Sequence, residues 1–318
     1  MGAMPTATLR QHPVAPPSTR APRRAGGGRR RAQRRLIIAL FLVAPLLLLI
    51  TFTYVPLVNV FRYSLWEWDG LDRNPENVGL ENYREVFSRS ELIGVFSVSL
   101  YYFFGAFIQM AAALYFATVL SFNVRFRNLF KGIIFFPHLI NGVAIGFIFL
   151  YFFQPDGVLD SLLGLGGMES LQQYWLGDRT YVNYSLAAVS IWRYTGINFV
   201  IFLGAIQSIP SELYEASSID GANRWQQFRY IILPGIRPVI GLLTILAISG
   251  AINVFEIPYV ITGGANGSTT FVIQTVQTAF QSNKVGLASA MAVVVLVLVL
   301  VIAVIQRTFF KDEAVQAT

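Results

Sequence analysis

Cysteine is absent from this chain of 318 residues, and histidine occurs only at His12 and His138. Without cysteine there is no disulfide, no thiolate metal site and no cysteine nucleophile, and nothing marks the redox compartment. With only two histidines, a histidine-built metal site or a Ser-His-Asp triad is not expected. The sequence therefore predicts neither catalytic nor metal-binding residues in this chain.

Charged residues are also scarce. They make up 13% of the chain, about half of the roughly 25% that is usual in a soluble domain. Hydrophobic residues make up 54%, and the mean hydropathy is +0.55. Since a disordered chain is poor in apolar residues, this composition argues against a disordered protein as well as against a cytosolic globular enzyme.

Positive charge is concentrated at the N-terminus. Residues 1–35 hold nine arginines and no acid, so the other 283 residues carry a net charge of −2. The segment is rich in Pro, Gly and Ala, which predicts a disordered tail. A nucleic-acid arm and a cytoplasmic anchor attracted to anionic lipid are the two interpretations. Because the tail directly precedes an apolar run, the anchor is favoured and no nucleic-acid partner is expected.

Long apolar runs dominate the rest of the chain. A helix that crosses the hydrocarbon core needs about 20 mostly apolar residues. Residues 79–89 predict a short amphipathic helix outside the bilayer. The expected spans are 36–61, 92–124, 132–153, 183–206, 238–261 and 285–306, within a domain of residues 36–310. The predicted fold class is therefore an all-α integral membrane protein with six transmembrane helices.

Lys and Arg are unevenly distributed between the two sets of segments that flank these spans. Segments 1–35, 125–131, 207–237 and 307–318 hold 17 of them, and the alternate segments hold 6. Cytoplasmic loops retain positive charge. We therefore expect both ends of the chain in the cytoplasm, including a short tail at 311–318, together with the 207–237 loop.

The 207–237 loop predicts two short helices joined by a glycine. Pro210 suits a first helical position, and Gly221 can adopt the left-handed conformation that ends a helix. A second amphipathic helix is expected from about Asn223, with Trp225, Phe228, Ile231 and Ile232 on or near one face and Pro234 and Pro238 at its end. Such a hairpin suits docking into a groove of another protein, and lying flat on the lipid surface is the alternative.

This loop carries a resemblance. Its residues follow a pattern of Glu-Ala-Ala, three residues, Gly, nine residues and Ile-x-Leu-Pro, with Ser217 in place of the second Ala. The matching positions are Glu215, Ala216, Gly221, Ile231, Leu233 and Pro234, with an Asp-Gly-Ala at Asp220, Gly221 and Ala222. A second similar segment follows at residues 255–265, where Glu256 replaces an Asp and Ala265 replaces a Pro. The chain resembles the inner-membrane permeases of binding-protein-dependent ABC importers, in their carbohydrate-uptake branch.

The resemblance implies a six-helix ABC importer permease bundle with a cytoplasmic coupling helix, in the bacterial plasma (inner) membrane. The implied partners are a second permease subunit in a heterodimer, two ATPase subunits that bind ATP and Mg, and an extracytoplasmic sugar-binding protein. This chain would bind no cofactor itself. Its ATPase-coupling residues would be Glu215, Ala216, Ser217, Asp220, Gly221, Ala222, Leu233 and Pro234.

Several polar residues interrupt the fourth and fifth spans, where charged side chains usually face the interior of a bundle. Arg193 and Glu256 are placed to form an intramembrane ion pair, which either locks the bundle or belongs to the translocation path. Candidates for contact with sugar hydroxyls and ring faces are Gln109, Tyr194, Asn198, Asn253, Glu256 and Tyr259.

Two rival functions are weighed against this interpretation. No phosphate loop of the form G-x-x-x-x-G-K-[ST] occurs, so ATP hydrolysis requires partner subunits. The glycine-rich segment 263–268 lacks the lysine and is expected to be a flexible external loop. A secondary transporter or channel acting without an ATPase predicts inverted repeats or broken helices in matched halves, and the sequence displays neither convincingly. A membrane enzyme would need a catalytic or metal cluster.

Overall fold

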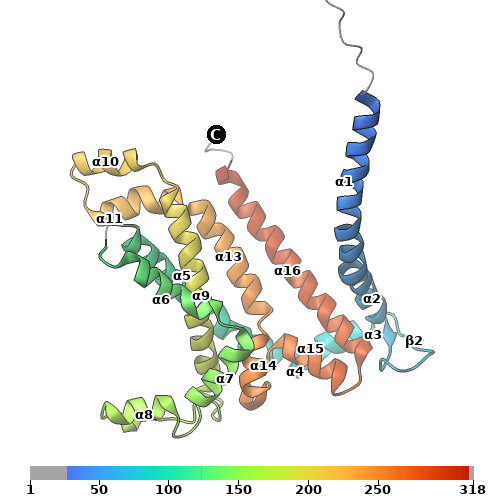
Figure 1. Ribbon diagram of the computed structural model, residues 1–318. Coiled ribbons are helices and arrows are strands. Elements are labelled where there is room, and N and C mark those ends of the chain that lie inside the picture. Colours follow the sequence, from blue (N-terminus) through green and yellow to red (C-terminus); the bar gives the residue numbers. More distant parts are fainter. Residues whose placement is uncertain (1–26, 123, 315–318) are drawn as a thin grey trace, which may run out of the picture. The chain divides into compact units, whose positions relative to one another are not determined.

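The computed structural model describes residues 27–122 and 124–314 (Figure 1). Most of the tail predicted at 1–35, and residues 315–318 of the one predicted at 311–318, lie outside the described residues. Helix α1 (Gly27–Leu49) begins before the predicted first span, and α16 (Val285–Ala314) continues past the last one. Arginine is a good helix former, so an arginine-rich flank can extend a helix beyond its apolar run.

Five helices of the described chain are long and apolar enough to cross a membrane, and a bent pair brings the number to six. They are Ile37–Tyr63, Ser90–Ser121, Val182–Gln207, Arg237–Thr262 and Val285–Ile305, with Arg127–Leu139 and Gly142–Phe152 as the bent pair. The all-α membrane class is confirmed. Only one ladder is described, in which β1 (Trp66–Glu67) pairs antiparallel with β2 (Glu76–Asn77).

The third span differs from its prediction as one helix over 132–153. It is divided into α6 (Arg127–Leu139) and α7 (Gly142–Phe152), which are bent by 95°. Ile140 is extended, and the Asn141 side chain accepts a hydrogen bond from the backbone N–H of Val143 at 2.9 Å. Because an N-cap of this kind starts a new helix, Asn141 ends the run that hydropathy treats as continuous.

The fifth span is also interrupted. Helix α13 (Arg237–Ile252) ends before Asn253, and α14 (Glu256–Thr262) begins three residues further on. Helix α14 packs against α7, where Gly142 and Gly146 present no side chain at the points nearest to Glu256 and Val260. Small residues four apart allow two backbones to approach closely inside a membrane.

Residues 57–318 form one compact unit. The most extensive contact between two helices of this unit joins α5 (Phe96–Ser121) to α9 (Val182–Gln207). The short α4 (Ser90–Gly94) precedes α5. Ala113 and Ala117 of α5 are fully buried against Phe199 and Phe202 of α9. Alanine next to a large aromatic ring lets the helices interdigitate, as close packing in a bundle requires.

Shorter helices lie at the ends of the spans. They are α3 (Glu81–Ser88), close to the predicted amphipathic helix at 79–89, α8 (Val158–Leu165), η2 (Glu169–Leu171), η4 (Ala265–Gly267) and α15 (Phe271–Phe280). The glycine-rich segment expected to be a flexible loop is packed instead. Asn183 Nδ2 donates to the Gly267 carbonyl at 3.0 Å, and the hydroxyls of Thr262 and Ser268 are 2.6 Å apart. The first of these contacts joins residues that are 84 positions apart, which local composition does not reveal.

Candidate functional site

The loop between α9 and α13 forms a helical hairpin at one end of the bundle (Figure 1). Its first helix is α10 (Ser211–Ile219), and Pro210 precedes this helix as its N-cap instead of occupying the predicted first position. Gly221 has a φ of +78°, as the sequence predicts. The Ala222 N–H donates to the Ser217 carbonyl at 2.9 Å, and the Gly221 N–H donates to the Ser218 carbonyl at 3.2 Å. This is the Schellman arrangement, which needs a left-handed residue at the glycine position.

The second arm of the hairpin begins with a capping box. Asn223 accepts from the Gln226 N–H at 2.9 Å, and the Gln226 side chain accepts from the Asn223 N–H at 2.7 Å. Helix α11 (Arg224–Gln227) then continues through a π-helical turn, η3 (Phe228–Ile232), into α12 (Leu233–Gly235). Because reciprocal capping satisfies two backbone donors, both the bend and the direction of the second arm are set locally.

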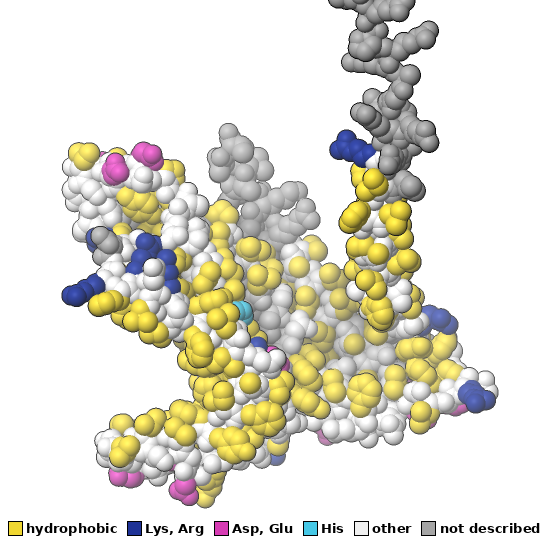
Figure 2. Space-filling view, in the orientation of Figure 1, with side chains coloured by type: hydrophobic (Ala, Val, Ile, Leu, Met, Phe, Trp, Pro, Cys, Tyr) yellow, Lys and Arg dark blue, Asp and Glu magenta, His cyan; other side chains and the backbone are white. Residues whose placement is uncertain are grey.

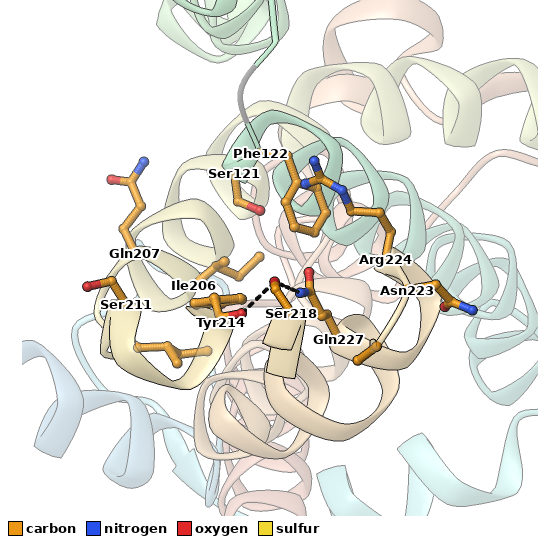
Figure 3. Close-up of a pocket in the computed structure, with 12 residues that line it drawn as sticks. Ser121, Phe122, Ile206, Gln207, Ser211, Tyr214, Ser218, Asn223, Arg224 and Gln227 are labelled. Carbon is orange, nitrogen blue, oxygen red and sulfur yellow. Dashed lines mark hydrogen bonds between the residues drawn. The ribbon is translucent and has the colours of Figure 1, made fainter. Parts of the chain in front are cut away.

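A buried glutamine ties the two arms together. Gln227 Nε2 donates to Ser217 Oγ at 3.2 Å and to Ser218 Oγ at 3.1 Å. Figure 3 shows Gln227 and Ser218 joined across the hairpin. The serine that replaces the second alanine of the family pattern thus accepts a hydrogen bond from the other arm. The sequence analysis missed Gln227, and the only signal for it was a polar residue on a face otherwise expected to be apolar.

A cavity of about 550 Å³ lies between the hairpin and the ends of α5 and α9 (Figure 3). The Arg224 guanidinium carbon lies 3.9 Å from the centre of the Phe122 ring, a cation–π contact. Burial raises the pKa of the Tyr214 hydroxyl. The lining residues are Ser121, Phe122, Ile206, Gln207, Ile209, Ser211, Tyr214, Ser218, Ala222, Asn223, Arg224 and Gln227. Beside this cavity, the fully buried Ile232 and Ile236 pack in one cluster with residues of α5 and α9, so apolar packing also holds the hairpin to the bundle.

The surface that the hairpin exposes is partly apolar. Ile219 and Trp225 are 87% and 68% exposed, although Trp225 was expected to share a face with Ile232, which is fully buried. Of the predicted coupling residues, Glu215, Ala216, Asp220, Gly221 and Pro234 are exposed, and Ser217, Ala222 and Leu233 are half-buried. Exposed apolar side chains that flank carboxylates are the kind of surface that a protein partner covers.

A second cavity, of about 490 Å³, lies inside the bundle among α5, α9, α13 and α14. The structure brings five of the six predicted path residues to its wall, namely Gln109, Tyr194, Asn198, Asn253 and Glu256. The sixth, Tyr259, is not among the lining residues and stacks on Phe255 at a ring distance of 4.6 Å. Residues from three different spans therefore converge, together with the unwound stretch between α13 and α14.

Two amides in this wall have free hydrogen-bonding capacity. Gln109 and Asn198 are each only 9% exposed, and neither side chain hydrogen-bonds to any other group in the part of the chain that the structure describes. The hydroxyl of Tyr102, another lining residue, is likewise buried without a described partner. Buried polar groups are nearly always satisfied. These side chains are therefore available to hydrogen-bond to water or to a ligand in the cavity.

Arg193 and Glu256 are in contact at the edge of this cavity. Arg193 Nη1 donates to Glu256 Oε2 at 2.7 Å. The side chain of Arg193 is 12% exposed and that of Glu256 is 42% exposed. The charge-assisted hydrogen bond joins α9 to the first residue of α14, on the far side of the break in the fifth span.

Gly142 allows the carboxylate of Glu256 to lie against the start of α7. A β-carbon at this position would overlap the Glu256 carboxyl group. Gly142 is the first residue of α7, and the dipole of a helix favours negative charge at its N-terminus. Glu256 therefore connects three elements, α7, α9 and α14, around one carboxylate. Sequence reasoning missed this role of Gly142, for which the Asn-Gly pair and the four-residue glycine spacing were the available signals.

We expect Gly142→Ala to displace the Glu256 carboxylate from Arg193 and to destabilise the protein by about 1–3 kcal/mol, the usual worth of a hydrogen bond to a charged group. Thermal unfolding of the purified protein in detergent measures the effect. Gly132→Ala in α6 is the matched control, because a β-carbon there meets nothing within 4 Å. Equal melting temperatures for the two variants would contradict the tight contact.

The amino-acid sequence is similar to those of known membrane transport proteins. A family profile described as "binding-protein-dependent transport system inner membrane component" matches residues 109–312. The probable ABC transporter permease protein YurN of Bacillus subtilis (strain 168) is 33% identical over 275 residues, covering 85% of this chain and 94% of that protein. The multiple sugar-binding transport system permease protein MsmF of Streptococcus mutans is 28% identical, covering 84% and 92%.

Solved structures share the fold. A bacterial alginate ABC transporter, solved in complex with an alginate pentasaccharide-bound periplasmic protein, contains a chain that superimposes with a TM-score of 0.78. The two chains are 20% identical, and the match covers 89% of this chain and 96% of the other. At this level of identity the likeness establishes the arrangement of helices alone.

Proposed function

Because the chain belongs to the family of binding-protein-dependent transport system inner membrane components, we propose that it is the permease subunit of an ATP-driven importer of a sugar or oligosaccharide. The family places it in the inner membrane as a multi-pass protein. The relatives MsmF and the arabinooligosaccharides transport system permease protein AraP of Halalkalibacterium halodurans, 31% identical over 235 residues, are described as sugar and oligosaccharide transport proteins. They support the sugar class.

The proposed complex contains a second, different permease, two ATPase subunits that bind ATP and Mg, and an extracytoplasmic sugar-binding protein. This chain contributes no catalytic group and binds no cofactor. Both of its termini and the hairpin of α10 and α11 lie in the cytoplasm, where the hairpin seats on an ATPase subunit. Glu215 and Asp220 are exposed on it and offer carboxylates to that partner.

The single observation that supports a sugar as the substrate is the cavity with the free amide groups of Gln109 and Asn198 in its wall. Hydroxyl groups of a sugar both donate and accept, which matches the donors and acceptors of Gln109 and Asn198. A volume of about 490 Å³ lies within the usual range for ligand cavities. In alternating access, closure of the ATPases moves the hairpin, and the bundle opens this cavity to the opposite side of the membrane.

The test is ATPase activity of the complex purified with its co-expressed partners and reconstituted with the binding protein. We expect stimulation by some members of a panel of glucose, maltose, raffinose, xylobiose and alginate oligosaccharide. In the Asn198→Leu variant, loss of hydrogen bonds worth about 1 kcal/mol each should raise the KM for uptake roughly tenfold. Val200→Leu, on the exposed side of the same helix, is the matched control and should not change it.

The alternative is a secondary transporter or channel that needs no ATPase. The broken helices at 140–141 and 253–255 are a feature that this alternative expects, and the sequence analysis did not identify them. Solute uptake by this chain without any ATPase subunit, or an ATPase rate that no sugar alters, would favour the alternative over the importer.

A further inference from the structure

Helix α8 (Val158–Leu165) exposes an apolar face that nothing in the described chain covers. Val158, Leu162 and Leu165 are 52%, 54% and 88% exposed. They are spaced at i, i+4 and i+7, so they share one side of the helix. The face continues beyond the helix with Met168 and Leu171, which are also exposed.

The opposite side of α8 is held to the protein, which fixes the rotation of the helix. Asp160 is 7% exposed and accepts a hydrogen bond from Trp175 Nε1 at 2.8 Å. Gln172 Nε2 donates to the Asp160 carbonyl at 2.9 Å. Because these contacts hold one side of α8 against residues 172–175, the helix cannot turn Leu162 and Leu165 inward.

Helix α8 follows the end of a membrane-spanning segment. Helix α7 ends at Phe152 and α9 begins at Val182, so the intervening segment starts and finishes at the same end of the bundle. Only residues 153–157 separate α7 from α8, a reach of roughly 20 Å at most. Helix α7 also exposes apolar side chains, including Phe147 and Tyr151, in the part of the helix nearest to α8 in the chain. Figure 2 shows hydrophobic side chains along the upper side of the arm that contains α8, and acidic side chains at the lower edge of this arm.

We propose that α8 is an interfacial helix, which lies in the surface of the bilayer leaflet on the side opposite the α10–α11 hairpin. Val158, Leu162 and Leu165 enter the boundary between headgroups and acyl chains, as the apolar face of an amphipathic helix does. Residues 153–172 contain three acids and no Lys or Arg. The attachment is therefore apolar and does not depend on anionic lipid.

This anchor acts on the element next to the cavity. Helix α7 is the half-helix whose first residue contacts Glu256, and α8 is tied to the other end of α7 by five residues. An anchored α8 holds that end of α7 at a fixed depth while the hairpin at the opposite end of the bundle moves. The lipid contact of α8 goes beyond the transport function proposed above, and its effect on α7 rests on that function.

Spin labelling tests the proposal directly, because the chain has no cysteine to remove. The full chain, with its co-purifying subunits, is placed in phosphatidylcholine nanodiscs as Leu162→Cys or Leu165→Cys and labelled with a nitroxide. Thr180→Cys, exposed in the same connecting segment, is the matched control. Power saturation then measures collisions with oxygen, which dissolves in lipid, and with a water-soluble nickel chelate.

We expect the labels at positions 162 and 165 to collide severalfold more often with oxygen than with the nickel chelate, and the label at 180 to show the reverse. Adding phosphatidylglycerol to the nanodiscs should leave these ratios unchanged. Nickel access at 165 equal to that at 180 would overturn the proposal and place the face in water. Protection from both reagents would also overturn it, because a protein partner would then cover the face.

Discussion

Gly221→Leu is expected to abolish ATP-driven uptake while the protein remains folded in the membrane. Gly221 has a φ of +78°, and a side chain other than glycine in this region costs about 1–2 kcal/mol. The cost is conformational, because a β-carbon at this position meets nothing within 4 Å. The strain is relieved by opening the bend between α10 and α11, which changes the direction in which the hairpin meets its partner. Solute uptake and ATP hydrolysis by the reconstituted complex measure the uncoupling.

Two further substitutions separate strain from bulk. Asparagine tolerates the left-handed conformation, so Gly221→Asn should retain most of the uptake. Gly221→Ala introduces the strain with little added volume and should fall between the two. If leucine at this position leaves uptake unchanged, the hairpin is not the element that transmits force from an ATPase subunit.

Glu256→Ala is expected to be more damaging to stability than Arg193→Ala. Removing the carboxylate leaves a guanidinium that is only 12% exposed without this partner, and leaving a buried donor unsatisfied in this way costs about 1–3 kcal/mol. Removing the arginine leaves a carboxylate that is 42% exposed and lies beside the N-terminus of α7, which offsets part of its loss. Thermal unfolding in detergent, followed by tryptophan fluorescence, gives both changes in melting temperature.

The double variant completes the cycle. Since neither charge is left unpaired in Arg193→Ala/Glu256→Ala, its loss of stability should be smaller than the sum of the single losses by about 1–3 kcal/mol. Strictly additive losses would show that the 2.7 Å contact contributes no coupling. The same three variants, assayed for uptake, separate a structural lock from a residue on the sugar path, because only the latter changes KM.

Much of the fold follows from local sequence. Each apolar run is long enough to span the bilayer. Each charged residue placed in lipid carries its own free-energy cost, whatever its tertiary contacts. The number and approximate position of the spans can therefore be predicted without knowledge of tertiary contacts. The hairpin is equally local, because Gly221 and the capping box at Asn223 act within a few residues.

The ends of helices, and the breaks within them, were predicted less well from the sequence. Hydropathy predicted one helix over 132–153, whereas the cap at Asn141 divides it by a 95° bend. Hydropathy averages over a window and does not register a single residue that redirects the backbone. The arginine-rich flank from Gly27 is helical for a related reason, because a helix follows backbone hydrogen bonding and not the edge of an apolar run.

The sequence alone thus determined the membrane class, the approximate places of the apolar runs and the glycine-centred hairpin, because each depends on free energies that act over one helix or one turn. Tertiary structure decided whether Arg193 and Glu256, which the sequence only proposes as partners, come into contact, and it added the contacts of Gln227, which the sequence does not predict. Arg193 and Glu256 are 63 positions apart, and Gln227 reaches the serines of the other arm only because the hairpin closes. A contact of about 3 Å requires two backbones to be fixed relative to each other, and only the packing of the whole bundle, including the absent side chain at Gly142, fixes them.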